Sequence, residues 1–233
     1  MLAFVIRRVF QSLIVLLVVG LVAFSLFRFV GDPVENMLGQ ERTQQDIDRL
    51  RTQLGLDQPF PVQYWRFLKN AAEGNFGVSY RQGRPVTDLL IERAPATLEL
   101  AFVSGVFALV GGIALGIYTA IRKSGWLAQF VMTASLIGVS LPTFLIGILL
   151  IWIFAVELGW LPSFGRGETV AVGWWTTGFL TVSGLKALIL PSITLGLYQM
   201  TLIMRLVRSE MLEVLRQDYI RFARARGLSE RAV

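Results

Sequence analysis

The chain has 233 residues, of which 54% are hydrophobic and 16% charged, and its formal net charge is +6. Soluble domains carry about 25% charged residues, so this composition indicates an integral membrane protein. The sequence contains no cysteine and no histidine, which excludes a disulfide framework, thiol chemistry, a Ser–His intramembrane protease and a His-bearing metalloenzyme. Basic residues gather at the ends of apolar runs, so membrane topology rather than nucleic-acid binding accounts for the charge.

An apolar run from residue 9 to about residue 27 follows Arg7 and Arg8. A signal peptide or a twin-arginine export signal also begins with basic residues, but here a longer span without a small-residue cleavage site follows directly. We therefore predict a first transmembrane helix within residues 1–30, with its N-terminus in the cytoplasm.

Residues 31–96 are polar and are predicted to form one periplasmic segment. Gly31-Asp32-Pro33 ends the first helix. Thr43 is a candidate cap of a short amphipathic helix that Gly55 closes. The predicted apolar face of that helix consists of Ile47, Leu50 and Leu54. A second short helix is expected between Pro61 and Gly74, followed by short extended pieces and turns.

A second span is predicted from Thr97 to about Ala120, running back to the cytoplasm. Gly112 and Gly116 form a GxxxG pattern that lets another helix backbone come close, although glycine is also frequent in membrane helices without such a contact. Residues 121–126 make a short cytoplasmic turn with Arg122 and Lys123. This turn lacks the glycine before lysine that a phosphate-binding loop requires, so we expect no ATP site in this chain.

A third span is predicted from about residue 129 to residue 156, with Pro142 near its middle. Proline removes a backbone donor and predicts a kink there. A structural kink is the favoured interpretation, and a gate or substrate path is the alternative. The candidate residues for either role are Gly138, Ser140 and Pro142. In the loop that follows, Trp174 and Trp175 are expected to anchor the chain at the membrane interface.

A fourth span is predicted from Leu188 to about Met204, with Pro191 at its start. Its helical pattern continues beyond the bilayer, and Arg205, Arg208 and Arg216 emerge on the cytoplasmic side, in agreement with an inside N-terminus. The predicted fold is an all-α integral membrane protein, a polytopic bundle with four spans in this chain. Residues 97–233 are its predicted core domain.

The last stretch, residues 213–233, predicts a short cationic helix. Asp218 is a candidate N-cap, and Arg224 and Arg226 suit the negative end of the helix dipole. Gly227 is expected in the left-handed conformation at C′, with Leu228 making the apolar contact of a Schellman motif. Two interpretations fit this pattern. The helix either lies against anionic lipid or couples the membrane spans to a partner protein.

A family resemblance favours the second interpretation. The run from Asp218 to Leu228 resembles the coupling-loop signature of ABC-importer permeases of the dipeptide, oligopeptide and nickel family, a signature of general form Glu-Ala-Ala, three residues, then Gly. Gly227 stands at the glycine and Ala223 at the second alanine. Arg221 and Phe222 stand at the glutamate and first-alanine positions, a departure that resembles the peptide-type branch. Residues 54–59, 74–79, 95–100 and 138–144 resemble the same family.

The resemblance implies the role of the chain. It implies a permease subunit, not an enzyme, that imports small peptides across the bacterial inner membrane as a multi-pass protein. The implied partners are a second permease subunit, two cytoplasmic ATPase subunits that carry ATP-Mg, an external substrate-binding protein and the lipid bilayer, with no nucleic acid. No cofactor is expected on this chain. The implied coupling residues are Asp218, Tyr219, Arg221, Ala223, Arg224, Ala225, Arg226, Gly227 and Leu228.

Three matters stay open at this stage. Similar subunits handle nickel complexes and glutathione, so these substrates are alternatives to peptides. The family has six spans, so we expect this chain of four to be a fragment. A secondary transporter needs intramembrane charges, of which the spans contain almost none, whereas a non-transporting membrane scaffold whose basic helix binds only lipid remains an alternative.

Overall fold

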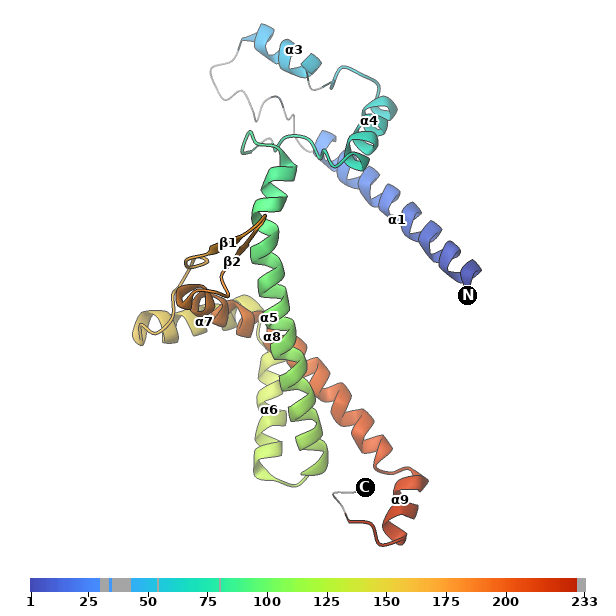
Figure 1. Ribbon diagram of the computed structural model, residues 1–233, viewed down its shortest axis with the longest axis vertical. Helices are drawn as coiled ribbons and strands as arrows, with labels where there is room; N and C mark the ends of the chain where they lie inside the picture. Colours follow the sequence, from blue (N-terminus) through green and yellow to red (C-terminus); the bar gives the residue numbers. More distant parts are fainter. Residues whose placement is uncertain (30–33, 35–42, 54, 80, 230–233) are drawn as a thin grey trace. The chain divides into compact units, whose positions relative to one another are not determined.

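The structure is a computed structural model that describes residues 1–29, 34, 43–53, 55–79 and 81–229. The break predicted at Gly31-Asp32-Pro33 and the position of Leu54 lie outside the described residues. The chain divides into two compact units, Met1–Arg93 and Ala94–Val233. The described part is mainly helical, as the sequence predicts, with one small β-hairpin that the sequence does not predict (Figure 1).

The first unit contains α1 (Leu2–Phe29), α3 (Gln44–Gln53) and α4 (Phe60–Ala72). Aromatic contacts pack α4 against α1: the Phe24 ring lies 5.5 Å from that of Phe67 and 5.8 Å from that of Tyr64, between centroids. The Tyr64 hydroxyl donates to the Leu17 carbonyl at 2.6 Å. The amphipathic helix predicted after Thr43 is α3, and Gly55 beyond it has a φ of +66°.

Three helices are long and apolar enough to cross a membrane: α1 over Leu2–Leu26, α5 (Val86–Ile121) and α8 (Val182–Val214). Both α5 and α8 begin earlier than predicted and contain proline, Pro95 and Pro191 respectively. Thr181 explains the early start of α8, because its side chain accepts a hydrogen bond from the Gly184 N–H at 3.0 Å and so caps the helix.

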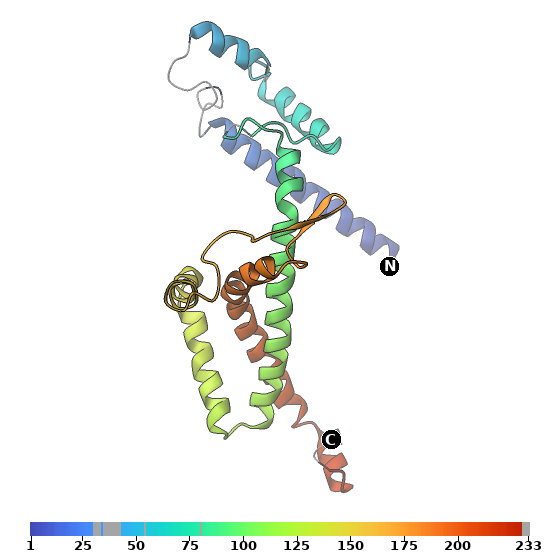
Figure 2. The ribbon, with the colours of Figure 1, turned by 60° about the vertical axis from the view of Figure 1, so that its left-hand side comes forward.

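The third predicted span is broken rather than kinked. It consists of α6 (Trp126–Ser140), α7 (Thr143–Ile151) and a π-helical turn, η1 (Trp152–Glu157), with a bend of 107° at the break. Pro142 has no N–H to continue the ladder of α6, and proline also disfavours a helical conformation at Leu141. Figures 1 and 2 show α6 running back beside α5 and α7 lying across the end of α6. The sequence predicted a kink at Pro142 without a size, and the structure has a full break in the helix there.

Glycines bring α5 and α8 into close contact. A Cβ built on Gly112 would lie 2.7 Å from Ile203 Cγ2 and 3.0 Å from the carbonyl oxygen of Met200. A Cβ on Gly116 would lie 2.8 Å from Val207 Cβ. Side chains at these two positions would therefore push the helices apart, and the close approach predicted for the GxxxG pattern is confirmed.

The hairpin lies between η1 and α8. Its strands are β1 (Val170–Val172) and β2 (Trp175–Thr177), which pair antiparallel with Val172 opposite Trp175. Gly173 in the two-residue turn has a φ of +64°, a conformation that hairpin turns of this length require and glycine adopts without strain. The final helix, α9 (Asp218–Ala225), follows the end of α8.

Candidate coupling site

The candidate coupling site is α9 together with the elbow that joins it to α8. After α8 ends at Val214, Leu215 keeps a helical conformation with a ψ of −12°. Gln217 then turns extended, with a φ of −64° and a ψ of 154°. This single extended residue sets the direction in which α9 leaves α8.

The start of α9 corrects one prediction. Gln217 rather than Asp218 is the N-cap residue, and no side chain makes a capping hydrogen bond there. A cap residue needs a non-helical conformation, which Gln217 has, whereas Asp218 is already the first helical residue. The Asp218 carboxylate instead pairs with Arg221 one turn later, at 3.6 Å between Oδ1 and Nη1. It still lies in the first turn, where a negative charge suits the helix dipole.

The end of α9 confirms the predicted Schellman motif. Gly227 has a φ of +81°. Its N–H donates to the carbonyl of Arg224 at 2.9 Å, and the Leu228 N–H donates to the carbonyl of Ala223 at 3.3 Å. These are the two hydrogen bonds that define the motif. They fix the length of α9 and the path of the chain behind it.

The surface of α9 is apolar and cationic. Ile220 is the buried residue of the helix, at 6% exposure. The exposed apolar side chains are Tyr219, Phe222 and Leu228. The Arg226 guanidinium lies over the Phe222 ring, 5.6 Å from its centroid. Arg221, Arg224 and Arg226 are also exposed. A buried anchor under exposed aromatic and arginine side chains is the composition that protein-binding surfaces favour.

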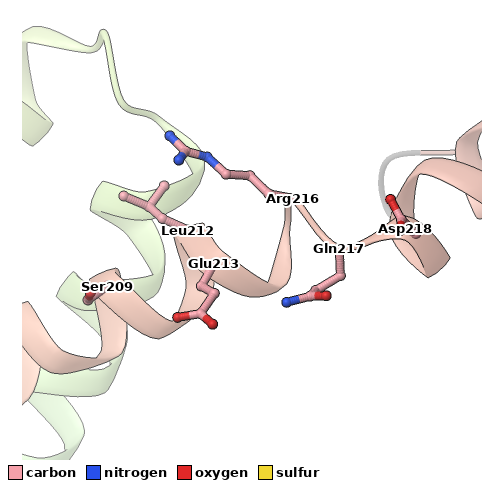
Figure 3. A pocket seen from close by; sticks show the side chains of 6 residues that line it. All are labelled: Ser209, Leu212, Glu213, Arg216, Gln217 and Asp218. Atoms are coloured by element: carbon pink, nitrogen blue, oxygen red, sulfur yellow. The ribbon is translucent and has the colours of Figure 1, made fainter.

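A groove runs along the elbow beside α9. Its volume is about 620 Å³, and its lining comes from the last turns of α8, the link behind it and the first residue of α9. The lining residues are Ser209, Leu212, Glu213, Arg216, Gln217 and Asp218. Figure 3 shows the Glu213 and Gln217 side chains on one side of the elbow and the Arg216 side chain on the other. The groove offers charges of both signs and is open to a partner.

The predicted path residues lie at the break between α6 and α7. Gly138 is half-buried, and a Cβ built on it would lie 3.4 Å from the hydroxyl oxygen of Thr201 on α8. Ser140 and Pro142 are exposed. Gly138 therefore serves helix packing, and the role of the three residues in a substrate path stays a prediction. Among the described residues, no group of three or more carboxylates, thiols or imidazoles could hold a metal ion.

Sequence reasoning missed a buried polar cluster around Glu99 on α5. The Glu99 side chain is 2% exposed and pairs with Arg166, whose Nη2 lies 3.1 Å from Oε2. The Trp175 Nε1–H donates to Oε1 at 3.2 Å, and the Gly178 N–H donates to Oε2 at 3.3 Å. Arg166 also donates to the hydroxyl and the carbonyl of Thr176.

The Glu99 cluster gives Trp175 a polar partner that the sequence did not predict. The indole N–H of Trp175 donates a hydrogen bond to a buried carboxylate, and the role of this residue as an interface anchor stays a prediction. Trp174 is 74% exposed and stays a candidate anchor. The available signal was a glutamate within the apolar span predicted from Thr97, because a charged residue there needs a partner. The sequence could not show that the partner lies in a loop far along the chain.

Comparisons with known proteins place the chain among transport proteins. Residues 112–233 match the model of a binding-protein-dependent transport system inner membrane component. Residues 1–101 match the model of the N-terminal part of such membrane components. A dipeptide transport system permease protein of Alkalihalophilus pseudofirmus is 38% identical over 100% of this chain and 74% of its own length. A glutathione transport system permease protein of Escherichia coli is 38% identical over 99% of this chain and 70% of its own length.

Proposed function

The chain belongs to the binding-protein-dependent inner membrane components, as a permease subunit of the peptide family of ABC importers, and we propose that it carries small peptides and is driven through α9. Membership makes it a multi-pass inner membrane protein of a transport system. The observation that carries the coupling role is the construction of α9, with a fixed length, a buried Ile220 and an exposed apolar and cationic surface.

The proposed partner of α9 is a cytoplasmic ATPase subunit. Exposed arginines pair with carboxylates, and Tyr219 and Phe222 are suited to fill apolar pockets in a partner surface. A nucleotide-driven movement of the ATPase can act on the spans only if the element between them moves as one body. α9 is suited to this need because the Schellman hydrogen bonds close its C-terminal end and because the turn at Gln217 joins it directly to α8.

The complete machine that we propose contains a second permease subunit, two ATPase subunits that bind ATP-Mg, and an external binding protein. We propose that this chain itself binds no cofactor. Its N-terminus lies in the cytoplasm, because Arg7, Arg8, Arg122 and Lys123 then all fall on the side that basic residues prefer. The same orientation places α9 in the cytoplasm and the hairpin outside.

Glutathione is the second candidate substrate. It is itself a small peptide, and a relative of the same identity, 38%, is named as a glutathione permease. A nickel complex has weaker support, since no cluster of metal ligands exists among the described residues. We favour small peptides because relatives named for dipeptide and peptide transport match the whole chain.

Uptake by the reconstituted transporter tests the proposal. Proteoliposomes containing this subunit and its partners are supplied with ATP and with labelled dipeptide, glutathione or nickel complex, each with the binding protein. We expect ATP-dependent accumulation of dipeptide. Accumulation of glutathione alone would replace the substrate assignment, and accumulation of none, with all subunits assembled, would contradict the transport role.

A further inference from the structure

A second cavity of the molecule lies at the turn between α5 and α6, away from the elbow. Its volume is about 380 Å³. The lining residues are Lys123, Ala128, Gln129, Met132, Thr133 and Arg208. Its charged groups are both cations, its other polar groups can donate hydrogen bonds, and no carboxylate lines it. A cavity of this character accepts an anion with several oxygens, such as a phosphate.

Arg208 is held in place before any ligand binds. Its Nη1 donates to the carbonyl of Thr119 on α5 at 2.9 Å. Thr119 is fully buried, so this contact fixes the guanidinium between α5 and α8 and leaves other N–H groups of Arg208 to face the cavity. One turn earlier, Arg205 has a buried Nε without a hydrogen-bond partner in the described part of the chain. No carboxylate within that part therefore neutralises the Arg205 and Arg208 side chains through an ion pair.

The cavity lies at the level of a membrane boundary. Lys123 belongs to the turn that joins two apolar helices, and Trp126, three residues later at the start of α6, is 78% exposed. Basic and aromatic side chains at the end of an apolar helix mark the headgroup region of a bilayer. Arg208 precedes the end of α8 at Val214 by more than one helical turn. The cavity is therefore separate from α9 and closer to the apolar part of the helices.

We propose that this cavity binds the phosphate of an anionic phospholipid headgroup, with Lys123 and Arg208 as the cationic contacts. Cavities with basic side chains between transmembrane helices suit such headgroups, whose acyl chains extend along the apolar helix surface. Met132 is the accessible apolar side chain on α6 beside which an acyl chain can begin, and Ala128 is buried behind it. This inference does not depend on the substrate or on the role of α9.

Native mass spectrometry of the assembled transporter tests the proposal. The delipidated complex is titrated with phosphatidylglycerol or phosphatidylcholine, and bound lipid is counted. Lys123→Gln should weaken phosphatidylglycerol binding about tenfold, because it removes one charge-assisted contact with the phosphate. Arg122→Gln removes the same charge from the neighbouring residue, which does not line the cavity, and should change binding less than about twofold.

Further variants and ligands distinguish a lipid site from diffuse surface charge and from a site for free phosphate. Thr133→Val removes a lining hydroxyl without changing charge and should also weaken phosphatidylglycerol binding. Phosphatidylcholine has the same phosphate with a choline cation attached, so it should bind the unaltered transporter more weakly than phosphatidylglycerol does. Equal effects of Lys123→Gln and Arg122→Gln would overturn the proposal in favour of diffuse surface charge. If millimolar inorganic phosphate displaced the bound lipid and itself remained bound to the complex, the assignment to a lipid would be overturned.

Discussion

Arg166 and Glu99 form an ion pair across 67 residues of sequence, with 3.1 Å between Nη2 and Oε2. Glu99 lies on α5, and Arg166 lies in the loop that leads to the hairpin. The carboxylate also accepts hydrogen bonds from Trp175 on β2 and from Gly178. One buried side chain thereby holds the hairpin and the start of α8 against α5. The close contact at Gly112 and Gly116 joins the same two helices further along α5. α5 and α8 are therefore held together both at the Glu99 cluster and at these glycines.

Glu99→Gln should destabilise the protein by about 3 kcal/mol, because it leaves a partly buried arginine without its counter-charge. An amide has one acceptor oxygen where the carboxylate has two, so hydrogen bonds from Trp175 or Gly178 are also lost. The measurement is thermal unfolding of the purified transporter. Glu92→Gln is the matched control, since the Glu92–Arg84 pair is exposed on both sides and should contribute less than about 1 kcal/mol. Equal effects of the two changes would contradict the account.

Gly112→Ala should destabilise the packing of α5 on α8 by about 1–3 kcal/mol, because the new methyl group meets both Ile203 and the backbone of Met200. Gly105→Ala in the same helix meets nothing within 4 Å. It should be neutral or stabilising by up to about 1 kcal/mol, since alanine favours the helix. Unfolding temperatures of the two variants, measured side by side in one detergent, check the contrast. Loss of stability in Gly105→Ala alone would refute it.

Gly227→Ala should cost about 1 kcal/mol and loosen the end of α9, because alanine disfavours the observed φ of +81°. Nothing lies within 4 Å of an added Cβ, so the effect comes from the backbone and not from a clash. Gly227→Asn is the control, as asparagine adopts this conformation more readily. ATP-dependent uptake at equal membrane insertion should fall in the order glycine, asparagine, alanine. Full uptake with a bulky residue such as valine would argue against coupling through α9.

Tyr64→Phe should destabilise the first unit by about 1 kcal/mol, because it removes the hydrogen bond from the hydroxyl to Leu17 and keeps the ring beside Phe24. Hydrogen exchange of the α4 amides is the measurement. Tyr198→Phe on α8 is the control, since the Tyr198 hydroxyl makes no hydrogen bond within the described residues. Unchanged exchange in Tyr64→Phe would show that α4 is held by the aromatic contacts alone.

Local chemistry explains which features could be predicted from the sequence. The Schellman motif at Gly227 depends on a few consecutive residues, and the break at Pro142 depends on one missing N–H, so both were predictable. The cap of α9 was misplaced by one residue. Its position depends on where α8 ends and on the extended conformation of Gln217, which the favourable capping chemistry of Asp218 does not reveal.

Long-range features were not predictable in the same way. The partners of Glu99 lie in a loop whose path depends on the packed helices, and the hairpin has only three residues in each strand. Strands this short give almost no alternating pattern. The size of the bend at Pro142 also depends on long-range packing, because contacts with other helices fix the direction of α7. The GxxxG pattern was predictable only in part. The sequence predicted a close helix contact at Gly112 and Gly116 but did not identify α8 as the neighbouring helix.

The most direct test of the central claim is a crosslink from α9. The chain has no cysteine, so Ala225→Cys places a single reactive thiol on the exposed surface of the helix. In the assembled transporter, this thiol should crosslink to an ATPase subunit, with a yield that changes between the nucleotide-free and ATP-bound states. Ser124→Cys, in the turn between α5 and α6, should give little adduct. An inserted and assembled Ala225→Cys variant that crosslinks to no ATPase subunit would contradict the coupling role of α9.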